Sequence, residues 1–75
     1  MNNSKLTKLY IYLNSETLGE AKIITQKQLL SNIGLSLRSE GTLKKMTDLL
    51  VKMGLLKIRR FKDEKGINRI EYKAQ

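Results

Sequence analysis

The apolar residues of this chain follow helical spacing up to residue 53 and alternate with polar residues after it. The first helical segment is residues 4–15, in which four apolar residues share one face: Leu6, Leu9, Tyr10 and Leu13. The run from Leu9 to Leu13 would also suit a strand. Ser4 precedes the stripe and has a side chain suited to an N-cap. Ile11 and Tyr12 lie off the stripe, so we expect them either to cover a neighbouring element or to contact a second subunit.

A second helix is predicted to begin at Thr25, after a β-prone run at residues 21–24 that is long enough for a small edge strand. Gln28 stands three residues after Thr25, which is the spacing of a capping box. Three apolar residues then share one face: Leu29, Leu30 and Ile33. Gly34 is placed to end this helix, and residues 34–38 are predicted to turn because they are too few to form another element.

A third helix, predicted over residues 39–53, has the clearest division into two faces. Its buried stripe consists of Leu43, Met46, Leu50 and Met53, with Leu49 widening it. The opposite face carries Gly41, Lys44, Lys45, Asp48 and Lys52, with Arg38, Ser39 and Thr42 at its start. Ser39 is a candidate N-cap, and Gly54 stands where the helix should end. A glycine inside a helix costs about 1 kcal/mol relative to alanine, so Gly41 leaves open a start as late as Thr42.

The alternating pattern after Gly54 predicts a β-hairpin with strands at residues 55–62 and 67–73. The four residues between them, DEKG, have the composition of a turn. A three-residue loop with a bulge at Gly66 would set Ile58 opposite Tyr72, whereas a register shifted by two would set Ile58 opposite Ile70. Both registers point the even-numbered residues inward, and both turn Phe61 away from the core.

Composition bounds the function that this pattern can serve. The 75 residues make one domain, residues 1–75. The chain has no cysteine and no histidine, and its seven carboxylates show no convergent spacing, so we expect neither an enzyme nor a cofactor or metal site. It has no apolar run long enough for a membrane span and no signal-peptide core at its start. We therefore expect no membrane partner. We expect the protein to lie in the cytoplasm of the host cell, associated with the nucleoid.

The charge favours an anionic partner. Fifteen basic and seven acidic residues give a formal charge of +8, and residues 38–75 alone hold eleven basic against five acidic residues. The excess therefore belongs to the third helix and the hairpin. Five cations lie around the predicted hairpin: Arg59, Arg60, Lys62, Lys65 and Arg69. Cations that protect a sheet edge from aggregation account for one or two of these, and double-stranded DNA is the partner that best fits the remainder.

The predicted order of elements resembles that of the winged helix-turn-helix family. The resemblance covers about residues 4–73 and is most specific in the segments TQKQLLSNIGLSLRS and TLKKMTDLLVKMGLL. Gly54, Leu55 and Leu56 match the glycine–aliphatic–aliphatic step that leads into the wing of that family. The family likeness implies an α+β fold with three helices, a short strand and a C-terminal two-stranded β-hairpin, the wing. Gly41 inside the presumed recognition helix departs from the pattern, although a missing side chain would let the backbone approach DNA closely.

The resemblance and the charge together imply a small, sequence-specific DNA-binding regulator of transcription, a repressor of the kind carried by plasmids or viruses. The third helix would enter the major groove, and the wing would lie along the backbone or reach a minor groove. The candidate DNA-binding residues are Lys27, Arg38, Ser39, Thr42, Lys44, Lys45, Arg60, Lys62 and Lys65. No trailing helix for pairing follows the wing, so a homodimer would use the first helix or the wing edge, or would form on DNA. The alternative is a winged-helix module that binds an acidic protein or assembles a replication or recombination complex.

Overall fold

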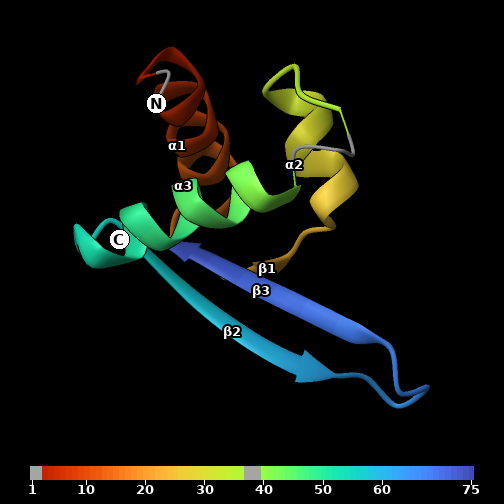
Figure 1. The fold of residues 1–75 in the computed structure, drawn as a ribbon. Coiled ribbons are helices and arrows are strands. Elements are labelled where there is room, and N and C mark those ends of the chain that lie inside the picture. The colour runs from red at the N-terminus through yellow and green to blue at the C-terminus, as the bar shows by residue number, and fades with distance from the viewer. Residues whose placement is uncertain (1–2, 37–39) are drawn as a thin grey trace.

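The computed structural model describes residues 3–36 and 40–75. Its elements are α1 (Asn3–Thr17), β1 (Lys22–Ile23), α2 (Gln26–Asn32), α3 (Glu40–Lys52), β2 (Leu56–Lys62) and β3 (Asn68–Ala74). The strands form an antiparallel sheet in the order β1-β3-β2, the three helices lie on one side of it, and the β2–β3 hairpin projects beyond the helices (Figure 1). This α+β topology confirms the predicted fold class and is consistent with a winged helix. Within the described ranges, no helix is long and apolar enough to cross a bilayer.

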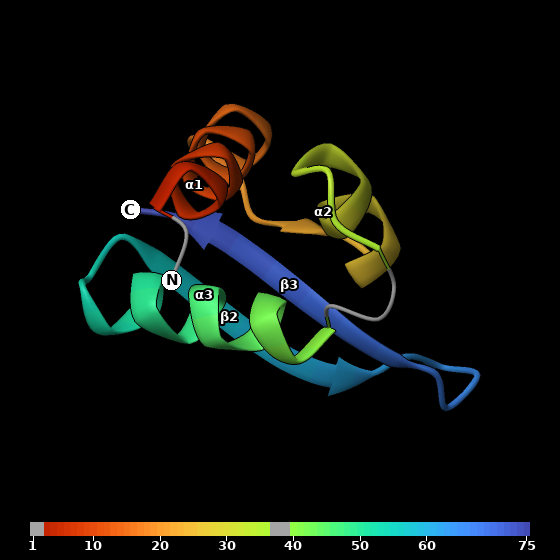
Figure 2. The ribbon, with the colours of Figure 1, turned by 45° about the horizontal axis from the view of Figure 1, so that its top comes forward.

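One hydrophobic core lies between the helices and the side of the sheet that faces them (Figure 2). The predicted apolar stripes supply most of its buried residues, which are Leu9, Leu13, Ile24, Leu29, Leu30, Ile33, Leu43, Met46, Leu50, Leu56 and Tyr72. The placement of Met53 in the core is wrong, because this side chain is 56% exposed. Since α3 ends at Lys52, Met53 lies in the turn that follows and has left the buried face. Ile11 is 60% exposed and so does not cover a neighbouring element of this chain.

The ends of α2 are set by short-range hydrogen bonds that the sequence predicts. The Oγ1 atom of Thr25 accepts from the backbone N–H of Gln28 at 3.1 Å, and Oε1 of Gln28 accepts from the N–H of Thr25 at 3.1 Å, which confirms the capping box. Gly34 follows the helix with φ of +74°. The Nζ atom of Lys5 donates to the carbonyl of Ile33 at 2.9 Å, so α1 also contributes to closing this end.

The first turn of α3 contains Gly41, since the helix already includes Glu40. A start as late as Thr42 is therefore wrong, and α1 likewise begins one residue before its expected cap, Ser4. At the other end, Gly54 adopts φ of +77°, as expected for the residue that ends α3. Arg38 and Ser39, predicted to lie at the start of this helix, are outside the described residues.

The hairpin has the first of the two predicted registers. Ile58 lies opposite Tyr72, and the N–H of Asp63 donates to the carbonyl of Ile67 at 3.0 Å. The shifted register, with Ile58 opposite Ile70, is wrong. On the other side of β3, the short strand β1 pairs at Tyr72 and Glu71 and so forms one edge of the sheet, as predicted for residues 21–24.

A buried hydroxyl joins the end of α1 to the end of β3. Thr17 is fully buried, and its Oγ1 donates to the carbonyl of Leu13 at 2.7 Å while it accepts from the N–H of Ala74 at 2.7 Å. The second bond connects residues 57 positions apart in the chain. Without it, a backbone N–H would be buried with no acceptor, which is unfavourable.

Thr17→Val tests this connection, because valine keeps the shape of threonine and lacks the hydroxyl. We expect the substitution to lower the free energy of unfolding by about 1–3 kcal/mol, the cost of leaving a buried N–H unsatisfied. The measurement is urea unfolding followed by circular dichroism. Thr17→Ser, which keeps the hydroxyl, should lose less; a Thr17→Val protein as stable as the wild type would contradict this role.

Candidate nucleic-acid interface

One face of α3 is buried and the opposite face is basic. Its buried residues are Leu43, Met46, Thr47 and Leu50, and its exposed polar residues are Thr42, Lys44, Lys45, Asp48 and Lys52. At about 100° per residue, Lys45 and Lys52 lie opposite the buried side, and Lys44 lies on a flank of the helix. The hydroxyl of Thr47 donates to the carbonyl of Lys44 at 3.0 Å and is satisfied within the helix. The outward lysines are thus free of the core, as predicted.

Arg60 and Lys62 lie on the same side of the sheet as α3. Side chains alternate across a strand, and Leu56 and Ile58 of β2 pack into or against the core, so the next two even-numbered side chains point the same way. Burial raises the pKa of Tyr72, and the positive charge of Arg60 partly offsets this rise, as expected for two groups on one face. The hairpin tip and the N-terminal end of α3 also lie at the same end of the molecule (Figures 1 and 2).

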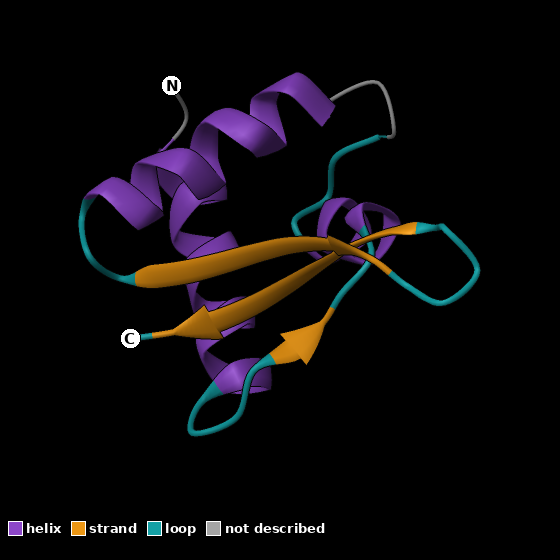
Figure 3. Cartoon of the chain, turned by 90° about the horizontal axis from the view of Figure 1, so that it is seen from below, coloured by secondary structure: helices purple, strands orange, loops and turns teal. Residues whose placement is uncertain are grey.

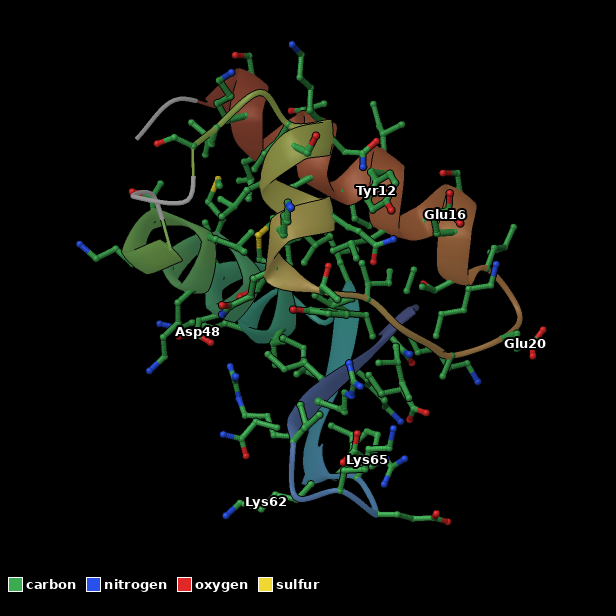
Figure 4. All side chains as sticks on the ribbon, turned by 90° about the vertical axis from the view of Figure 1, so that its right-hand side faces the viewer. Tyr12, Glu16, Glu20, Asp48, Lys62 and Lys65 are labelled. Atoms are coloured by element: carbon green, nitrogen blue, oxygen red, sulfur yellow. The ribbon has the colours of Figure 1, made fainter. Side chains whose placement is uncertain are left out.

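The acidic side chains of the first third of the chain lie away from this surface. Figure 4 shows Asp48 of α3 and Lys62 of the hairpin projecting to one side, while Glu16 and Glu20 lie on the other. Tyr12 lies on the side of the glutamates, and burial, followed by the charge of Glu16, raises its pKa. An approaching polyanion therefore meets the cationic side of the molecule with these two carboxylates turned away.

A groove of about 590 Å³ lies between the hairpin and the start of α2. Its polar wall includes Thr25, Gln26, Arg60, Lys62 and Asn68. Amide, hydroxyl and cationic groups of this kind donate hydrogen bonds to phosphate and sugar oxygens. The sequence analysis identified Arg60 and Lys62 but missed Gln26 and Asn68, because their proximity depends on β1, which leads into α2, pairing with β3.

Ion pairs divide the hairpin cations into two groups. Arg59 pairs with Glu71 at 3.1 Å and Arg69 with Asp63 at 3.0 Å. The remaining cations of the predicted site are in none of the ion pairs among the described side chains, and they are exposed: Lys27, Lys44, Lys45, Arg60, Lys62 and Lys65. Exposed pairs add little stability, but they orient the two arginines that they hold. Arg38 and Ser39 lie outside the described residues, and no cluster of three or more possible metal-binding side chains occurs in the described ranges.

The hairpin tip is organised by the carboxylate of Asp63. Its Oδ1 accepts from the backbone N–H groups of Lys65 and Ile67 at 2.9 Å each, and its Oδ2 accepts from Nε of Arg69 at 3.0 Å. The hydrogen bond from Ile67 contributes most to lowering the pKa of Asp63, and the hydrogen bond and charge of Arg69 and the backbone hydrogen bond from Lys65 lower it further. The same bonds fix the backbone next to Lys65 and so position the tip of the hairpin.

The lowered pKa of Asp63 gives a pH test of this turn. A carboxylate with a lowered pKa in the folded state stabilises that state above its ordinary pKa of 3.8, and this contribution is lost as the pH falls through the lowered value. An NMR titration of the Asp63 carboxyl carbon should therefore give a midpoint below 3.8. Arg69→Ala should shift that midpoint upward, and Asp63→Asn should remove this acid-dependent step from hairpin unfolding. A wild-type midpoint at or above the ordinary value would show that the turn is not held in this way.

Comparison of the chain with protein-family models, with curated proteins and with solved structures gives no significant match. The likeness to a winged helix therefore rests on the order of elements, the β1-β3-β2 sheet and the projecting hairpin.

Proposed function

We propose that this protein binds double-stranded DNA sequence-specifically and acts as a small regulator of transcription. The outward face of α3 enters the major groove, where Thr42, Lys44 and Lys45 reach base edges or flanking phosphates. The hairpin lies along the adjacent backbone, with Arg60 and Lys62 on phosphates. A single α3 reads one half-site, so high specificity requires two copies of the protein on a palindromic site.

The proposal rests on one observation: exposed cations of α3 and of the hairpin lie on the same side of the sheet. Lys44 and Lys45 of α3 and the hairpin residues Arg60 and Lys62 lie on the side of the sheet that the helices cover. The N-terminal end of α3 lies at the end of the molecule where the hairpin projects (Figure 1). No described ion pair neutralises these four cations. An assembly module for an acidic protein would use the same charge, but it would not need a cationic hairpin beside the start of an outward-facing helix.

The salt dependence of binding tests the proposed contact surface. Five cations make it up: Lys44, Lys45, Arg60, Lys62 and Lys65. If each displaces a counterion from a phosphate, the logarithm of the association constant should fall with the logarithm of salt concentration with a slope of about −4.5. Fluorescence anisotropy on a duplex selected from a random pool measures this slope. A protein that binds an acidic protein partner but leaves every duplex unbound at low salt would refute the proposal.

Lys45→Ala tests the orientation of α3, with Lys8→Ala as the matched control. Both side chains are exposed helical lysines, and only Lys45 lies on the proposed surface. We expect Lys45→Ala to weaken binding and to reduce the magnitude of the salt slope by about 1, because one phosphate contact is lost. Lys8→Ala should leave the slope unchanged. Equal losses in the two variants would mean that binding follows net charge rather than this face of α3.

A further inference from the structure

The second face of the sheet is exposed and mostly cationic. No described helix covers this face, which is seen in front of the helices in Figure 3. The odd-numbered residues of β2 and β3 point to it, because the even-numbered ones point toward the helices. Its charged residues are Lys57, Arg59, Arg69, Glu71 and Lys73, and Asp63 next to β2 pairs with Arg69, so four cations share this face with two carboxylates. We call this set the outer-sheet surface.

Two lysines of this surface are placed directly opposite each other. Lys57 of β2 pairs in register with Lys73 of β3, and both are exposed. The N–H of Gln75 donates to the carbonyl of Leu55 at 3.0 Å, so these two residues form a hydrogen-bonded pair of the ladder. Pairs of this kind recur at every second residue of an antiparallel ladder, so Lys57 and Lys73 also form one, with Cα atoms about 5.5 Å apart. Like charges directly opposite each other destabilise a sheet. An anion between the two ammonium groups would relieve that repulsion.

The neighbouring arginine of this surface is held in a defined position. Nε of Arg59 lies 3.1 Å from Oε1 of Glu71, and its guanidinium lies over the ring of Phe61, 4.4 Å from the centroid. Its side chain is nevertheless 63% exposed. A guanidinium oriented by a carboxylate and a ring loses less conformational entropy when it binds a phosphate.

Protection of a sheet edge accounts for only part of this charge. Cations on an edge strand prevent pairing with another chain, and this explains Lys57 and Arg59 on β2. On β3, Arg69 is held by the carboxylate of Asp63, whereas Lys73 is in none of the described ion pairs. The two facing lysines, Lys57 and Lys73, are therefore the charges of this surface that an anionic ligand would neutralise.

We infer that the outer-sheet surface binds the backbone of a second DNA duplex, so that one protein molecule bridges two duplexes. This inference rests on the proposed function, which assigns the first duplex to α3 and the helix-facing side of the hairpin. Contacts from exposed lysines and arginines on a flat sheet reach phosphates rather than base edges, so the second duplex is bound without sequence preference.

A two-duplex capture assay tests this inference. A duplex carrying the selected site is fixed to beads, protein is added at less than one molecule per site, and recovery of a second, labelled duplex is measured. We expect the wild type to recover the second duplex and Lys57→Ala/Lys73→Ala to recover roughly tenfold less, since two charge-assisted phosphate contacts are lost. Lys8→Ala/Lys22→Ala removes the same charge from exposed positions outside both surfaces and should recover it nearly as well as the wild type.

Binding to the first duplex is measured alongside by anisotropy, and circular dichroism confirms that each variant is folded. Lys57→Ala/Lys73→Ala should bind a single duplex as tightly as Lys8→Ala/Lys22→Ala does. Tight binding of one duplex with no capture of a second by the wild type would overturn the inference and leave the proposed function intact. Undiminished capture by Lys57→Ala/Lys73→Ala would also overturn it, because bridging would then run through paired protein molecules. Failure of the wild type to bind any duplex would remove the proposed function and the inference with it.

Discussion

Burial of three helices against a single face of the sheet decides where the charged side chains of the described residues lie. Leu56 and Tyr72 are the fully buried residues that the strands β2 and β3 give to that core. A chain of 75 residues buries only about 60% of the surface that it exposes when unfolded, so the core has no room for ionised groups. The cations of the described residues therefore lie on the outward face of α3, the projecting hairpin, the uncovered side of the sheet, the edge strand β1 and the outer faces of α1 and α2.

The small core and the high charge connect stability to ligand binding. A formal charge of +8 destabilises the compact state through self-repulsion, and the three described ion pairs, which are all accessible to solvent, offset little of it. A polyanion that binds only the folded chain shifts the folding equilibrium toward it. Salt acts in both directions, since it screens the repulsion within the protein and also competes with the protein for phosphates.

Local interactions explain why so much of the fold could be predicted from the sequence. The capping box at Thr25, the glycine after α3 and the turn at Asp63 each depend on residues within a few positions of one another. The bond between Thr17 and Ala74 could not be predicted, because a threonine at the end of a helix carries no signal for a partner 57 residues away. The misplacement of Met53 has a similar cause: helical spacing continues in the sequence for one residue after the helix has ended.

The sequence predicted which residue types form the candidate site, but it did not predict how the cations of the hairpin are divided between the two faces of the sheet. Alternation places Arg59 and Arg60, which are neighbours in the chain, on opposite faces of β2. The two arginines also differ in the residues that they contact. Arg59 meets Glu71 across the sheet, whereas Arg60 lies near Tyr72 on the helix-facing side and borders the groove beside α2. Consecutive cations in a strand therefore do not form one patch, because alternate side chains point to opposite faces of the sheet. The residues that lie opposite each cation in register determine whether its charge stays available to a ligand.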